Sequence, residues 1–329
     1  MHVVPLRHLG NRPLPLERLQ RHLGLERRRV VAARSSAHLL CSSNTGLCPR
    51  PSEQPTHYQP CSNSRGHFCV TARNRLVDNL NLLIDLHIAA DRQGPGGEAE
   101  TRRAIELSGL SKRRSLKVAD IGCGTGASTL VLARELDAQI IAVDSLSEFL
   151  EVLRSRAAQA GLSDRIGTVN ASMDTLPFEA GSLDAIWSEG AIYNMGFESG
   201  VRQWRRFLKR GGILAISELT WLTASRPAEL EAHWCTQYAE VGTASSKLAV
   251  LERNGYAPMA YFVLPEHCWL DAYYGPMQQR LPAFLARHES SDAAKAVAAA
   301  EELEIALYER YRAFVGYGYY VARKTEGAP

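Results

Sequence analysis

The sequence predicts a doubly wound α/β protein, in which helices cover both faces of a mostly parallel sheet. Two observations lead to this fold class. From residue 116 onward, short apolar runs alternate with amphipathic segments of helical length, which is typical of a parallel sheet. The first apolar run also ends in three glycines within five residues, Gly122, Gly124 and Gly126. Such a loop lets a strand turn sharply into a helix whose N-terminus faces a ligand.

The elements follow in order from residue 76. Leucines at helical spacing predict a helix over about 76–87, and a second helix covers 99–108. Strands over 116–121 and 139–143 each precede a helix, at 127–135 and 147–160. Strands at 166–169 and 183–187, a helix at 200–208 and a strand at 212–217 come next, with Gly211 and Gly212 turning into the last strand. Helices at 228–238 and 245–254, a strand at 259–264, a helical stretch at 276–314 and a strand at 315–321 complete the chain.

The first 75 residues differ from the rest in composition. They hold 12 arginines, no lysine and three acids, which leaves 26 of the 38 basic and 32 of the 35 acidic residues to 76–329. Because this arm lacks sustained periodicity, we expect a basic, disordered extension. An Arg-rich transit peptide, or residues upstream of the natural start, are alternatives. The predicted organisation is this extension and one domain over 76–329, with added helices at about 228–254 and 276–314.

Charge and composition narrow the classes of partner. The acidic balance of 76–329 gives no attraction for phosphates, so we expect no nucleic-acid partner. No run of 18 apolar residues is present, so no membrane span is expected. The seven cysteines match no zinc-binding spacing, and we expect no metal. The N-terminus lacks the apolar core of a signal peptide, so we expect a cytoplasmic protein. The oligomeric state is left open.

Three segments predict a site for an adenosyl-containing cofactor. Asp120 ends the first strand and precedes the loop of Gly122, Cys123, Gly124, Thr125 and Gly126. Asp144 ends the second strand with Ser145 beside it, where a carboxylate can accept both ribose hydroxyls. Ser172, Met173 and Asp174 follow the third strand; the Asp can accept the adenine amine while the Met packs on the ring. The glycine pattern alone also fits a dinucleotide site, so an NAD(P)-dependent oxidoreductase is the alternative.

With these segments in order, the chain resembles class I S-adenosylmethionine (SAM)-dependent methyltransferases. The resemblance rests on the loop of 120–126, on Asp144, on the segment 172–178 and on the strand at 183–187. It is close to the large group that contains quinone-biosynthesis methyltransferases. A nearer likeness to bacterial methyltransferases of unassigned substrate rests on 187–194 and 92–96. It covers roughly 76–325, whereas the arm has no counterpart, and the helix-rich segment before the last strand is longer than the minimal fold requires.

This resemblance implies a seven-stranded sheet whose last strand, 315–321, runs antiparallel between its neighbours. SAM would be the cofactor, lying across the carboxyl ends of the strands, with Ser188 at the end of the fourth strand among its contacts. Methyl transfer would be a direct displacement by a small-molecule acceptor, with alignment and desolvation supplied by the protein. A SAM-binding regulator without turnover stays open, because binding residues do not prove turnover.

Glu189, Tyr193 and Glu218 are the catalytic candidates, since they follow the fourth and fifth strands. Glu189 could be a base or an acid that positions the cofactor. His267 and Glu266 follow the strand at 259–264, where a surface or structural histidine is the more ordinary interpretation. The remaining aromatic residues could line a pocket or pack in the core: Trp187, Trp221, Trp269, Tyr273 and Tyr274.

Overall fold

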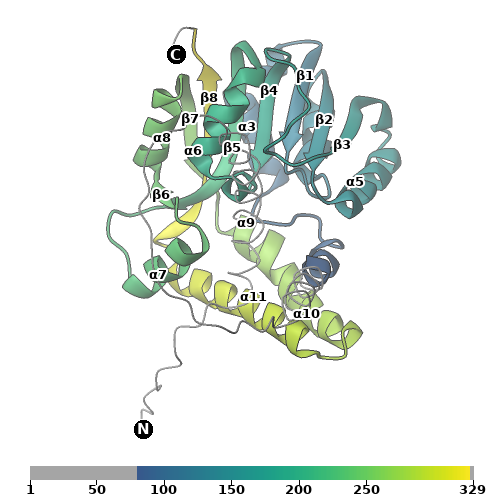
Figure 1. Ribbon diagram of the computed structural model, residues 1–329, viewed down its shortest axis with the longest axis vertical. Helices are drawn as coiled ribbons and strands as arrows, with labels where there is room; N and C mark the ends of the chain where they lie inside the picture. The colour runs from purple at the N-terminus through teal and green to yellow at the C-terminus, as the bar shows by residue number, and fades with distance from the viewer. Residues whose placement is uncertain (1–79, 327–329) are drawn as a thin grey trace, which may run out of the picture. The chain divides into compact units, whose positions relative to one another are not determined.

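A computed structural model describes residues 80–326 of the chain (Figure 1). The predicted extension over 1–75 and the start of the predicted helix at 76–87 lie outside these residues. The chain divides into two units, Met1–Asn81 and Leu82–Pro329. All the elements described below belong to the second unit, which opens with helical turns that run to residue 87.

The central sheet has the predicted doubly wound topology. Its order is β3-β2-β1-β4-β5-β8-β7, and β1 to β5 are parallel to one another. The last strand, β8, pairs antiparallel with both β5 and β7, which confirms its expected direction. The two-residue β6 pairs with β5 and adds an eighth strand to the predicted seven. The strands are β1 (Leu116–Ile121), β2 (Ala138–Asp144), β3 (Ile166–Asn170), β4 (Leu183–Glu189), β5 (Leu208–Trp221), β6 (Gly242–Thr243), β7 (Tyr256–Val263) and β8 (Val315–Lys324).

Helices pack on both faces of this sheet because alternate strand residues are apolar on both sides. On one face α3 (Glu98–Ser108) and α4 (Ala127–Glu135) join Val118 and Trp187 in one buried cluster. On the other, α6 (Phe197–Trp204) and α8 (Ala244–Arg253) join Ile121 and Ile216. α5 (Ser147–Gln159) packs through Leu150 against Ala142 of β2. Single helical turns are η1 (Leu110–Lys112), η2 (Ser163–Arg165), η3 (Ile192–Asn194) and η4 (Arg205–Phe207).

A separate group of helices lies beyond the carboxyl ends of the parallel strands (Figure 1). It consists of α7 (Ala228–Gln237), α9 (His267–Trp269), the π-helix η5 (Leu270–Tyr274), α10 (Gly275–Arg287) and α11 (Asp292–Tyr311). α11 leads into the start of β8, where Val315 pairs with Trp221 at the carboxyl end of β5. The apolar faces of α10 and α11 pack against Leu82 and Leu86. The predicted helix at 245–254 corresponds to α8. It does not belong to this group, because it covers a face of the sheet.

Two predicted boundaries are wrong for local reasons. The single helical stretch at 276–314 is interrupted at 288–291, where Glu289 and Ser290 have positive φ and Ser291 caps α11. A right-handed helix cannot continue through such residues. The fifth strand begins at Leu208 instead of residue 212, because its pairing with β4 continues across a register shift. Gly211, at φ 68°, therefore lies within the strand, at this irregularity.

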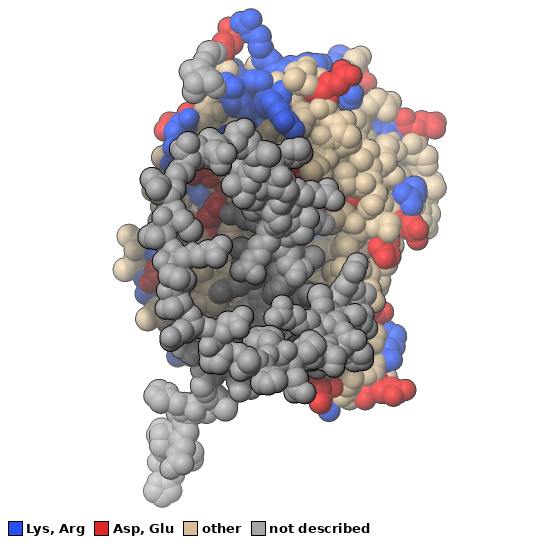
Figure 2. Space-filling view, viewed as in Figure 1, with Lys and Arg blue, Asp and Glu red and all other residues tan. Residues whose placement is uncertain are grey.

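The surface in view carries both signs of charge (Figure 2). A group of Lys and Arg lies at the end where β8 finishes, opposite α10 and α11 (Figures 1 and 2). Within residues 80–326, every helix is too short or too polar to cross a bilayer.

Candidate functional site

The three predicted cofactor segments meet at the carboxyl edge of the sheet. Asp120 and the glycine loop follow β1, Asp144 ends β2, and the segment 172–174 follows β3. The strand order reverses between β1 and β4, whose carboxyl ends bound this loop. Open α/β sheets bind their ligands at such a switch point. The fold thus brings together residues that are up to 54 positions apart in the sequence.

The glycine loop needs glycine at each of its three positions. Gly122, Gly124 and Gly126 have φ of 73°, 55° and 92°, in the region that side chains disfavour. A Cβ at Gly122 would overlap Ala191, one at Gly126 would overlap Leu153, and one at Gly124 would overlap the Gln93 side chain. The conformation of the loop is therefore set by its glycines and by close packing with its neighbours, independently of a ligand.

Asp144 holds the glycine loop and keeps room for further hydrogen bonds. Its carboxylate accepts from the Gly124 amide and from the Leu146 amide, each at 2.9 Å. Burial raises the pKa of Asp144, while these amides oppose the shift. A carboxylate has about four acceptor positions, so Asp144 can still accept from a hydroxyl donor. Ser145, beside it, is exposed.

Asp120 is fully buried and faces the first turn of α4. It accepts from Ser128 Oγ at 2.8 Å and Thr129 Oγ1 at 2.6 Å, through one oxygen. The other oxygen has no partner among the described residues. Burial raises the pKa of Asp120 to about 7, because charge is costly there and the two hydroxyls only partly offset it. The hydrogen bonds from Ser128 and Thr129 join β1 to α4.

The segment after β3 lies beside the glycine loop. Met173 is half-buried, and its Cε is 3.6 Å from the position of a Cβ on Gly122. Ser172 Oγ donates to the exposed Asp174 carboxylate at 3.2 Å. Ser188 is different, because it is fully buried and donates to the Ile121 carbonyl at 2.8 Å. That contact ties β4 to β1 and gives Ser188 a structural partner.

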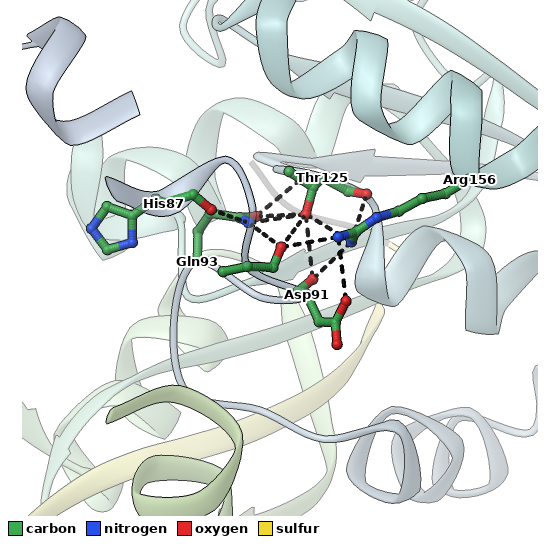
Figure 3. Close-up of polar contacts among 6 residues, drawn as sticks. His87, Asp91, Gln93, Thr125 and Arg156 are labelled. Carbon is green, nitrogen blue, oxygen red and sulfur yellow. Dashed lines mark hydrogen bonds and ion pairs between the residues drawn. The ribbon is translucent and has the colours of Figure 1, made fainter. Parts of the chain in front are cut away.

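A segment before the sheet clamps the glycine loop (Figure 3). Gln93 Oε1 accepts from the Thr125 amide, and Gln93 Nε2 donates to Thr125 Oγ1, both at 2.9 Å. Arg156 of α5 donates to Thr125 Oγ1 at 3.0 Å and to the Ala90 carbonyl at 3.1 Å. Thr125, predicted as a cofactor contact, is thus fully buried and engaged with protein groups. The segment 92–96 contributed to the family resemblance, but the sequence assigned no role to Gln93. Nothing in the sequence indicated a role for Arg156.

Glu189 is the centre of a buried hydrogen-bond network. Its Oε2 accepts from Arg92 at 2.6 Å. Its Oε1 accepts from Thr101 at 2.7 Å and from Trp187 and Tyr319 at 2.9 Å. Only 7% of the Glu189 side chain is exposed. These four hydrogen bonds hold the carboxylate in one place, so this setting favours an anchoring role over the predicted base.

Tyr193 and Glu218 belong to a group of tyrosines and glutamates that we call the acid–tyrosine cluster. Its members come from the loop after β4, from β5 and β8, and from the helices beyond the edge: Tyr193, Glu218, Tyr274, Glu301, Glu304 and Tyr317. Burial raises the pKa of Tyr193 to about 12, and the charges of Glu304, Glu218 and Glu301 add to this shift. Tyr274 donates to Glu304 Oε1 at 3.0 Å. This hydrogen bond joins η5 to α11.

The acids of this cluster have few counter-charges. Glu218 lies 4.0 Å from Lys247, and His87 lies 3.6 Å from Glu301. Burial raises the pKa of Glu218 to about 7 and that of Glu304 to about 8, the neighbouring Glu301 contributing to the latter. Solvent still reaches part of Tyr193, Glu304 and Tyr317. An excess of buried acid next to solvent-accessible tyrosines suits a ligand that carries positive charge or N–H donors.

The other candidates lie elsewhere. His267 is exposed and lies 3.4 Å from Glu100, and Glu266 pairs with Arg312 at 3.3 Å. Trp187, Trp221, Trp269, Tyr273 and Tyr274 are all buried in the core cluster of the α3 and α4 face. A cavity of about 850 Å³ lies at the amino ends of β1 and β2, lined by Arg114, Lys117, Arg134 and Arg165 among others. It is at the opposite edge from every cofactor motif, so we do not assign it to the site.

Comparison with known proteins agrees with this geometry. Residues 118–212 match a family model described as a methyltransferase domain. Methyltransferase GfsG of Streptomyces halstedii is 33% identical over 130 residues, which are 39% of this chain and 46% of that protein. The 27-O-demethylrifamycin SV methyltransferase of Amycolatopsis mediterranei is 32% identical over 41% of this chain and 50% of that protein. The chain thus spans about half the length of the curated relatives it matches.

A solved structure shares the fold over most of the described chain. It is a SAM-dependent methyltransferase from Geobacter sulfurreducens in complex with S-adenosyl-L-homocysteine, with a TM-score of 0.65 and 19% identity. The alignment covers 74% of this chain and 98% of that one. Residues 118–212 therefore resemble a methyltransferase domain, and the chain has the fold of this SAM-dependent methyltransferase. The resemblance inferred from the sequence is confirmed, and the oxidoreductase alternative is not supported.

Proposed function

We propose that this protein transfers a methyl group from SAM to a small-molecule acceptor. The observation that carries the proposal is the glycine loop after β1, at the switch between β1 and β4, with Asp144 of the neighbouring β2 bonded to it. That arrangement places backbone and a carboxylate where an adenosyl group can be held from two neighbouring strands.

The residues at this edge fit such a cofactor. Asp144 retains acceptor positions for the ribose hydroxyls beyond its two amide contacts. Asp174 is exposed and can accept the adenine amine, and the half-buried Met173 offers an apolar surface for the ring. When bound, SAM supplies a methyl group made electrophilic by its sulfonium charge. The chain's part is then to orient the two reactants and to exclude water from them.

The acid–tyrosine cluster is the proposed place of the acceptor. It lies at the same edge and is covered by α11, so an acceptor must fit between that helix and the sheet. Tyr193 is the candidate to hold the acceptor, because it lies in η3 of the loop after β4 and its side chain is half-buried. The unbalanced acids favour an acceptor with a basic amine.

Calorimetric titration of the full chain tests the cofactor part. We expect SAM and S-adenosylhomocysteine to bind with one site each and NADH not to bind. Binding of NADH in preference to SAM would refute the proposal.

A panel of acceptors with matched shapes tests the acceptor part. Each amine is paired with the alcohol of the same skeleton, and methyl transfer is followed by mass spectrometry. We expect turnover of amines over alcohols, and loss of this preference in Glu304→Gln. Tight SAM binding without turnover of any acceptor would favour the regulatory alternative.

A Tyr193→Phe variant should lose roughly a hundredfold in turnover while SAM affinity stays within a few fold.

A further inference from the structure

Three side chains with metal-binding atoms converge outside the cofactor edge. Glu100 lies in the first turn of α3, and His267 and Cys268 form the start of α9. One ligand atom from each lies within 4.8 Å of the other two. His267 Nε2 is 3.4 Å from Glu100 Oε1 and 3.7 Å from Cys268 Sγ. The sequence did not indicate this group, because Glu100 is far from His267 and Cys268 along the chain.

These separations match the edges of a tetrahedral coordination shell. Zinc bonds of about 2.0–2.1 Å to nitrogen, 2.0–2.2 Å to oxygen and 2.3 Å to sulfur imply N···O and N···S separations of about 3.4 and 3.6 Å. An ion could therefore enter between the three side chains with little rearrangement.

Glu100 supplies a second, independent indication. The residue is only 8% exposed, yet its Oε2 has no hydrogen-bond partner among residues 80–326. Leaving a buried carboxylate oxygen unpaired is costly. A Cβ at Gly97 would overlap this same oxygen, so the backbone there makes room for it. Arg92 is a cation close enough to act on the Cys268 thiol. Its charge is neutralised by Glu189, which lies 2.6 Å away.

We propose that Glu100, His267 and Cys268 bind one transition-metal ion, with zinc the best match to this donor set. Thiolate and imidazole ligands select zinc over magnesium or calcium, which prefer oxygen. The exposed side of His267 leaves the fourth position to water. The Cys268 thiol gives up its proton to solvent as the metal–sulfur bond forms. The ion would join α3 to α9, next to the Cys268 carbonyl that accepts from the Gly96 amide at 3.4 Å.

Cobalt substitution of the full-length, chelator-treated protein tests the site directly. A cobalt–thiolate bond gives a charge-transfer band in the near ultraviolet, and tetrahedral cobalt absorbs strongly in the visible. We expect both features to saturate at one equivalent and to disappear when zinc is added. Cys268→Ala should lose the charge-transfer band, whereas the control Cys235→Ala should keep it, because Cys235 is exposed on α7.

His267→Ala is the second variant, chosen because its exposed side chain can be removed without leaving a core cavity. We expect its zinc affinity to fall by more than the roughly 10–100-fold that the loss of an outer-shell partner costs, because a direct ligand is removed. Zinc should raise the melting temperature of the parent but not of this variant. A band that persists in Cys268→Ala would assign the metal to other cysteines, including the four before residue 80, and would overturn the proposal. So would unchanged zinc affinity in His267→Ala, or no band in the parent.

Discussion

Replacement of Glu189 by glutamine separates an anchoring role from a catalytic one. The glutamine has almost the same volume, but it removes the charge opposite Arg92 and turns one acceptor into a donor. Arg92 and Glu189 are both largely buried, at 12% and 7% exposure, and their closest atoms are 2.6 Å apart. Removing one partner of a buried ion pair costs about 3–5 kcal/mol, because the other charge is left without compensation.

The expected result is a large loss of stability. Urea unfolding of Glu189→Gln should show a free energy of unfolding lower by about 3–5 kcal/mol. For a domain of this size the melting temperature should fall by roughly 6–20 °C. Glu198→Gln is the matched control, since Glu198 also pairs with an arginine, Arg253, at 2.7 Å, but both side chains are about half exposed. That variant should lose less than about 1 kcal/mol.

Two outcomes would refute this reasoning. If Glu189→Gln is as stable as the parent, the four hydrogen bonds do not anchor the segment around Arg92. If it is stable but turnover falls roughly a hundredfold with SAM affinity kept, Glu189 acts on the reactants as a base.

The remaining predictions concern the glycine loop and its supports. Asp144→Ala should lower SAM affinity at least tenfold, which is about 1.4 kcal/mol, and calorimetry that shows parental affinity would exclude the ribose role. Gln93→Ala leaves the Thr125 amide without its acceptor, so this amide should exchange hydrogen faster; equal protection in parent and variant would show that the clamp is unimportant. For Asp120, burial raises the folded-state pKa to about 7, from 3.8. Between these values the folded state holds the extra proton, so rising pH favours unfolding. The stability of Asp120→Asn relative to the parent should therefore increase from about pH 4 to pH 7, by up to about 4 kcal/mol, and a pH-independent difference in urea unfolding would contradict this.

The three predicted cofactor segments lie at one edge because of a simple property of parallel sheets. Strand order and direction bring the carboxyl ends of β1, β2 and β3 together, so local motifs at each end become neighbours. The glycine loop, Asp144 and the segment at 172–174 needed only the strands that precede them to be recognised. The antiparallel last strand came from the family resemblance rather than from periodicity.

The tertiary structure decided which polar groups are free and which are engaged. Thr125 and Ser188 stand within cofactor motifs, yet their hydroxyls are bonded to Gln93, Arg156 and Ile121. Glu189 follows a strand as a catalytic acid would, but its partners Arg92 and Tyr319 lie 97 and 130 residues away. Local sequence cannot show such contacts.

The sequence by itself determined the α/β class, the order of most elements and the resemblance to methyltransferases, and it predicted the cofactor edge. Each depends on hydrophobic periodicity or on residues close together in the chain, which a sequence displays directly. Only the tertiary structure showed the four donors around Glu189, the hydrogen bonds between Gln93 and the glycine loop, and the approach of Glu100 to His267 and Cys268. These arrangements depend on packing between distant elements, and burial sets the charge and hydrogen bonding of each group there.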